Sequence, residues 1–145
     1  VEVSATGSRL FDQGAQEHGD FDTAVTTMRA ASGAQITIIN SRHSAAGYDQ
    51  RLEAFGSSGA LRVANASADL VSVSTAAGAD RKAPYEPFFL ERYAAAYRAE
   101  LREFISLIQG GPSRLATFDD GRAALMLADA AQLSAVERRI VTVDL

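Results

Sequence analysis

The stretch TAVTTMRAASGAQITIINSR, residues 23–42, decides the fold of this chain of 145 residues. Its two runs, 23–30 and 34–42, are bounded by Gly, Ser or Asp turn residues and are typical of strands. Only residues 31–33 separate them, whereas a parallel pair needs a crossover of about a dozen residues or more. The stretch therefore predicts an antiparallel hairpin.

Further strands are predicted around this hairpin, at residues 1–10 and 48–55, and shorter strands at 61–63 and 70–73 are expected to continue the sheet. Successive side chains of a strand point to opposite faces, so Ile36 and Ile38 face one way and Ile39 the other. A sheet whose outer side meets only water rarely carries apolar groups on both faces. We expect another subunit or domain to cover the outer side.

The second half of the chain predicts helices. After a loop at residues 76–87, apolar residues recur at helical spacing until Gly110, Gly111 and Pro112 end the run. These residues are Phe89, Tyr93, Tyr97, Leu101, Phe104, Ile105 and Ile108. Thr117 and Asp120 form a capping pair that begins a second helix, which continues to about Ala135, and residues 139–145 return to a strand. Residues 1–145 are therefore expected to form a single α+β domain, with a largely antiparallel open sheet and two helices packed on one face.

Composition excludes several classes of protein. The formal net charge of −4 gives no basic surface for nucleic acid, and the absence of cysteine removes disulfides, thiolate nucleophiles and cysteine zinc sites. No apolar run is long enough to span a membrane, and the first residues lack the basic-then-apolar layout of a signal peptide. We expect a soluble cytoplasmic protein. Because Val1, Val3 and Ala5 already alternate with polar residues, we also expect that a longer chain precedes Val1.

The sequence offers few groups for chemistry. It contains no glycine-rich nucleotide-binding run and no G-x-S-x-G turn, so neither cofactor binding nor hydrolysis is expected of these residues. His18 reads as a solvated turn residue, and no histidine stands at a metal-ligand spacing. Asp119 and Asp120 are interpreted as helix-capping acids, and Arg81 and Lys82 as solvated cations.

The polar segment 40–51 is the candidate ligand edge. Arg42 can donate a fork of hydrogen bonds and Tyr48 can stack or donate, which suits a polyhydroxylated ligand. The alternative, favoured by spacing alone, is that Arg42, Asp49 and Arg51 form cross-strand ion pairs on an exposed sheet face.

This segment resembles the inositol 2-dehydrogenase branch of the Gfo/Idh/MocA oxidoreductases. The matching residues are Asn40 to Arg42, Gly47 to Arg51 and Glu53 to Gly56, followed by Phe88 to Tyr93, Ala96-Tyr97, Glu100-Leu101, Phe104 and Asp119 to Gly121. The resemblance implies the C-terminal domain of a dehydrogenase whose N-terminal Rossmann domain, with the catalytic residues, is absent from this chain. It implies NAD or NADP as cofactor of the full-length enzyme and none for this chain.

The resemblance further implies a polyol or sugar substrate and a homo-oligomer assembled through the open sheet face. Arg42, His43 and Tyr48 are the expected substrate-pocket residues, and no catalytic or metal-binding residue is expected. The chain departs from the family in two places, since Ala46 stands where a substrate-contacting Tyr is usual and His43 where a second Arg is common. Two other hypotheses remain open: a free-standing noncatalytic module that dimerises through its sheet, and a small ligand-binding domain.

Overall fold

The computed structural model describes all residues 1–145, which fall into two compact units. The first unit comprises Val1–His43 and Ala116–Leu145, and the second comprises Ser44–Leu115. Together they contain antiparallel sheets and helices, which confirms the predicted α+β class. None of the helices combines the length and the apolar character needed to cross a membrane.

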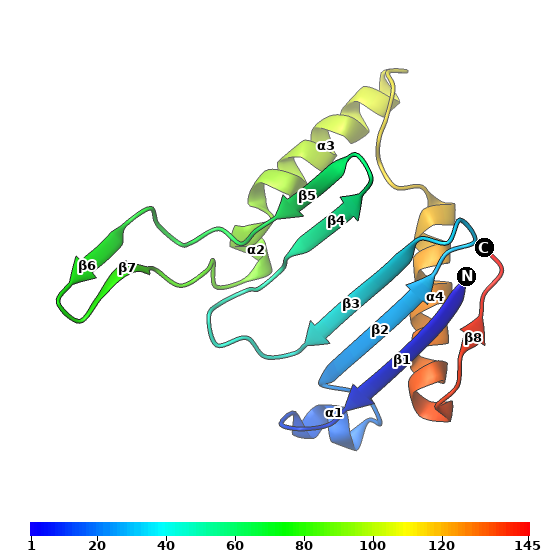
Figure 1. Ribbon diagram of the computed structural model, residues 1–145. Coiled ribbons are helices and arrows are strands. Elements are labelled where there is room, and N and C mark those ends of the chain that lie inside the picture. The colour runs from blue at the N-terminus through cyan, green and yellow to red at the C-terminus, as the bar shows by residue number, and fades with distance from the viewer. The chain divides into compact units, whose positions relative to one another are not determined.

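The first unit is built on a four-stranded antiparallel sheet of order β3-β2-β1-β8 (Figure 1). Its strands are β1 (Glu2–Ser8), β2 (Thr23–Arg29), β3 (Gln35–Ser41) and the short β8 (Val141–Thr142). The β2–β3 hairpin predicted from residues 23–42 is confirmed, with Gly33 in its turn at a φ of +87°. A short helix, α1 (Gln13–Glu17), joins β1 to β2, and the exposed His18 ends it. The sequence analysis did not predict this helix.

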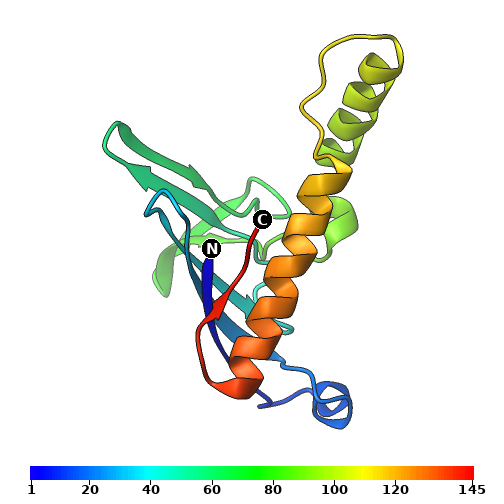
Figure 2. The ribbon, with the colours of Figure 1, turned by 90° about the vertical axis from the view of Figure 1, so that its right-hand side faces the viewer.

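Helix α4 (Phe118–Glu137) packs against one face of this sheet (Figure 2). The predicted capping pair is confirmed, because the Thr117 hydroxyl accepts from the Asp120 amide and the Asp120 carboxylate accepts from the Thr117 amide. The core between helix and sheet consists of Val3, Ala130, Val141 and Val143, with Met28, Met126, Leu127 and Ala131 packed against it. Alternation therefore turns one side of β1 toward the helix and the other side away from it.

Ser134 connects three parts of the first unit. It lies on α4, is 1% exposed, and its Oγ accepts a hydrogen bond of 2.9 Å from the Ala5 amide of β1. The same hydroxyl donates to the Arg139 carbonyl at 2.6 Å. Since β8 pairs with β1 only at Glu2 and Val3, Ser134 supplies the acceptor that a longer β8 would have offered to Ala5. The predicted strand 139–145 is correspondingly reduced to two residues.

The sheet face away from α4 carries Val25 and Ile39, paired in register across β2 and β3. Ile39 is 75% exposed. The other residues around it on that face are small and polar, and the threonines among them also present a methyl group: Ser4, Thr6, Thr27 and Thr37. The expectation that apolar groups occur on both faces is confirmed for this sheet.

The second unit contains two separate hairpins and two helices. The hairpins are β4 (Leu52–Gly56) with β5 (Gly59–Val63) and β6 (Ser72–Thr75) with β7 (Gly78–Lys82). The expectation that strands at 61–63 and 70–73 continue the main sheet is wrong, because each strand pairs locally across a tight turn. The predicted helix beginning at Phe89 is interrupted at Tyr93, giving α2 (Phe89–Arg92) and α3 (Ala94–Ile108). No residue of this unit is buried, and the apolar side chains of α3 remain exposed.

Asp22 organises the loop that follows β1. Its side chain is 1% exposed, and Oδ2 accepts from the amides of Leu10, Phe11 and Asp12 at 2.6, 2.9 and 3.0 Å. Oδ1 accepts from the Thr23 hydroxyl at 3.1 Å. Burial pushes the pKa of Asp22 upward, but these hydrogen bonds to the charged form outweigh it and leave the pKa below its ordinary value of 3.8.

Replacing Ser134 with Ala should destabilise the first unit by about 2 kcal/mol, because the Ala5 amide loses its buried acceptor and the Arg139 carbonyl loses its donor. Urea unfolding monitored by far-ultraviolet circular dichroism measures the change. Gln132→Ala, on the exposed side of the same helix, should alter stability by no more than about 0.5 kcal/mol. Equal effects of the two substitutions would contradict the assigned role of Ser134.

Replacing Asp22 with Asn should remove part of the acid sensitivity of folding. Because the pKa of Asp22 is depressed in the folded state, its stabilisation is fully present above pH 3.8 and is lost as the pH falls through the lower folded value. Urea midpoints measured from neutral to acidic pH should therefore fall less steeply for Asp22→Asn, which starts from a lower midpoint. Asp129→Asn, at an exposed site on α4, should reproduce the original pH profile.

Candidate functional site

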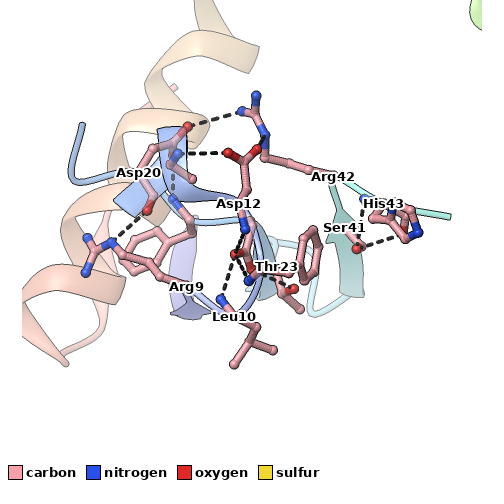
Figure 3. Close-up of polar contacts among 12 residues, drawn as sticks. Arg9, Leu10, Asp12, Asp20, Thr23, Ser41, Arg42 and His43 are labelled. Carbon is pink, nitrogen blue, oxygen red and sulfur yellow. Dashed lines mark hydrogen bonds and ion pairs between the residues drawn. The ribbon is translucent and has the colours of Figure 1, made fainter. Parts of the chain in front are cut away.

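Arg42 follows the end of β3 and is held by two carboxylates (Figure 3). Its Nε lies 2.7 Å from Asp12 Oδ2 and its Nη1 lies 3.6 Å from Asp20 Oδ2. Its backbone amide donates to the Asp22 carbonyl at 2.9 Å. The backbone hydrogen bond therefore restrains the main chain at Arg42, and the two ion pairs restrain its guanidinium group.

Asp12 is positioned by the helix that it caps. Its Oδ1 accepts from the Ala15 amide at 3.1 Å. This amide is the main cause of the lowered pKa of Asp12; burial opposes the shift, and the charge and hydrogen bond of Arg42 reinforce it. The carboxylate that faces Arg42 is thus ionised over the neutral range.

His43 lies next to Arg42 and packs by a ring edge against Phe11, with the ring centroids 5.8 Å apart. The Ser41 hydroxyl donates to the His43 carbonyl at 3.0 Å and accepts from the His43 amide at 3.3 Å. The imidazole itself is exposed and forms no hydrogen bond with the protein. The end of β3 therefore presents a restrained guanidinium beside an accessible imidazole.

Tyr48, the third expected pocket residue, belongs to the second unit. Its amide donates to the Glu86 carbonyl at 2.8 Å, and the Tyr85 amide donates to the Ala46 carbonyl at 2.8 Å. Gly47 between them has a φ of +113°, and a Cβ at that position would lie 2.7 Å from the Tyr85 carbonyl oxygen. Only glycine fits this backbone pairing without displacing it.

The Tyr48 ring stands edge-on to the Tyr93 ring, with centroids 5.7 Å apart and an interplanar angle of 81°. The Tyr93 hydroxyl forms a hydrogen bond with Oε1 of Gln50. Burial, followed by contact with Tyr48, raises the pKa of Tyr93 above its ordinary value of 10.0. The phenol is therefore a neutral hydrogen-bond donor at physiological pH.

Asp49 is bound by two neighbours. Asn65 Nδ2 donates to its Oδ1 at 2.5 Å and Arg51 Nε lies 2.9 Å from the same atom. The Asn65 hydrogen bond is the main cause of the lowered pKa of Asp49, burial opposes it, and Arg51 lowers the pKa further. The alternative of cross-strand ion pairs among Arg42, Asp49 and Arg51 is therefore wrong. Asp49 and Arg51 do pair, but within one segment that precedes β4, and Arg42 pairs with other acids.

The structure brings Arg42 and His43 together and places Tyr48 in the other unit. Sequence reasoning missed the two acids that hold Arg42, because Asp12 and Asp20 lie far from it along the chain. No group of three or more His, Asp or Glu side chains could hold a metal ion. Arg81 and Lys82 lie exposed on β7, and neither forms an ion pair.

Comparisons with known proteins give one consistent family. The family described as "Oxidoreductase family, C-terminal alpha/beta domain" matches residues 1–145. Myo-inositol 2-dehydrogenase of Thermotoga maritima is 42% identical over 143 residues, which cover 99% of this chain and 42% of that protein. The chain thus spans less than half the length of this relative.

Two solved structures extend the comparison. A myo-inositol dehydrogenase from Corynebacterium glutamicum superposes with a TM-score of 0.94 at 45% identity, covering 99% of this chain and 43% of that one. Scyllo-inositol dehydrogenase from Lactobacillus casei, solved with bound NAD(H) and scyllo-inositol, gives a TM-score of 0.83 at 27% identity, covering 97% and 41%. The chain belongs to the Gfo/Idh/MocA oxidoreductases and corresponds to their C-terminal alpha/beta domain.

Proposed function

We propose that this chain is the C-terminal part of an NAD- or NADP-dependent dehydrogenase that oxidises a secondary alcohol of inositol or a related polyol. The observation that carries the proposal is the full-length match of residues 1–145 to the C-terminal domain of this family, together with relatives named as inositol dehydrogenases. In this proposal the chain supplies a wall of the substrate pocket and the oligomer interface, and it is inactive alone.

The proposed wall comprises Arg42, His43 and Tyr48, whose side chains suit a ligand rich in hydroxyl groups. The two ion pairs of Arg42 use Nε and Nη1, so Nη2 retains donors for a substrate oxygen. His43 can donate or accept through its imidazole, and Tyr48 offers a phenol. None of these groups is proposed to take the hydride, so they bind and orient the polyol.

The nicotinamide cofactor is assigned to the rest of the enzyme. All strand pairs in this chain are antiparallel, so it contains no β-α-β unit of the kind that binds a dinucleotide. It also has no glycine-rich turn leading from a strand into a helix. In this proposal the dinucleotide is held outside these residues, and the bound NAD(H) of the L. casei relative supports NAD as the cofactor of the full-length enzyme.

The proposed oligomer interface is the sheet face that carries Val25 and Ile39. An exposed isoleucine among threonine methyl groups forms a partly apolar surface that a second copy can cover. The same face favours the second candidate function, a free-standing module that dimerises through its sheet. A homo-oligomer is expected in either case.

Replacing Ala46 with Tyr in the full-length enzyme should change the ratio of kcat/KM between myo-inositol and scyllo-inositol by about tenfold, because a phenol would enter the proposed pocket wall. Steady-state kinetics with both polyols measure the ratio. Ala31→Tyr, in the β2–β3 turn, is the matched control and should leave the ratio unchanged. An unaltered ratio for Ala46→Tyr would remove this segment from the pocket.

Replacing Ile39 with Lys should dissociate the proposed oligomer, because a charge would enter the proposed interface, where Ile39 is 75% exposed in the single chain. Light scattering should give a multiple of the monomer mass for the original chain and for Ile39→Val, and the monomer mass for Ile39→Lys. An original chain that stays monomeric at high concentration would exclude the proposed interface.

A further inference from the structure

Two segments that match the family separately meet in the second unit. Residues 46–50 form a turn around Gly47, and Tyr93 stands at the junction between α2 and α3. The Tyr93 ring packs on Tyr48 and its hydroxyl binds Gln50, so one side chain contacts two residues of this turn. The proposed pocket wall includes Tyr48, but nothing in it uses Tyr93.

The backbone of Tyr93 is well restrained. It ends α2, donating its amide to the Phe89 carbonyl at 2.8 Å, and it precedes α3, accepting from the Tyr97 amide at 2.9 Å. Its side chain is half-buried, and the Tyr97 ring packs against it with centroids 6.2 Å apart. These backbone hydrogen bonds and the ring contact restrain the position of the Tyr93 phenol.

The turn that Tyr93 contacts is also restrained by hydrogen bonds to other residues. Tyr85 and Glu86 pair with the backbone of Ala46 and Tyr48 and leave no room for a Cβ at Gly47. At the end of the turn, the Gln50 amide donates to Asn65 Oδ1 at 2.8 Å. The backbone of the segment is thus held by residues 65, 85 and 86, while the Tyr48 and Gln50 side chains are held by Tyr93.

We propose that Tyr93 is a positioning residue that fixes the Tyr48 and Gln50 side chains, and through them the segment Ala46–Gln50, in the shape in which it meets the polyol. This rests on the proposed function, since that function places the segment in the pocket wall. Tyr93 acts through Tyr48 and Gln50 and does not itself contact the reacting atoms.

The test uses the full-length enzyme with Tyr93→Phe, which keeps the ring contact and removes the hydroxyl. Loss of one hydrogen bond should raise KM for the polyol by about fivefold. The kcat and the KM for the nicotinamide cofactor should change by less than about twofold, because neither depends on this segment. Gln50→Met should give the same effect, and the double variant should be no worse than either single one, since both remove the same bond.

Hydrogen–deuterium exchange supplies a readout that does not depend on activity. Tyr93→Phe should accelerate exchange in peptides that contain residues 46–50, because the segment loses one of its restraints. Tyr97→Phe is the matched control: its ring also contacts Tyr93, but its hydroxyl makes no hydrogen bond, so both exchange and KM should stay unchanged. Unchanged exchange in Tyr93→Phe, or accelerated exchange without a rise in polyol KM, would overturn the inference.

A second pair of variants separates failure of this inference from failure of the proposed function. Gly47→Ala must displace the turn, whereas Gly33→Ala imposes left-handed strain in the open β2–β3 turn, where no atom lies within 4 Å of the added Cβ. If Gly47→Ala raises the polyol KM and Tyr93→Phe does not, Tyr93 is not the positioning residue. If neither changes it, the segment is not part of the pocket wall.

Discussion

The first unit depends on one buried hydroxyl, that of Ser134. A sheet edge leaves amides without acceptors, and here β8 ends after two residues, so the Ala5 amide would be unpaired beneath α4. Ser134 accepts from it and donates to the Arg139 carbonyl just after the helix. The position of α4 on the sheet, and the path of the chain from α4 to β8, are thereby fixed by the same atom.

Much of the first unit could be predicted from local pattern. The hairpin of residues 23–42 follows from a connection too short for a crossover, and the start of α4 follows from Thr117 and Asp120 alone. The second unit was harder to predict, because β4 to β7 pair locally and none of its residues is buried, so no continuous apolar face marks its topology. No Gly or Pro stands at the break between α2 and α3, so the sequence does not predict that the helix is interrupted at Tyr93.

The candidate site, too, could be predicted only in part from the sequence. The polar segment 40–51 was found from its composition and its family match, and its residues are indeed exposed or half-buried. The acids that pair with Arg42 were not predicted. One of them, Asp12, lies in a loop whose shape depends on hydrogen bonds from three backbone amides to Asp22. Long-range contacts of this kind depend on tertiary structure, which spacing along the chain does not encode. The contact between Tyr48 and Tyr93 was not predicted for the same reason, although both residues lie in motifs that match the family.

The clustering of aromatic hydroxyls has a spectroscopic consequence. The chain has four tyrosines, Tyr48, Tyr85, Tyr93 and Tyr97, and no tryptophan. All four belong to Ser44–Leu115, so the phenol absorption and emission of the chain originate entirely from the second unit. The first unit contributes only phenylalanine bands. Phenylalanine, in contrast, occurs in both units, so the tyrosine bands alone are specific to one of them, and they follow events in the second unit without any dye.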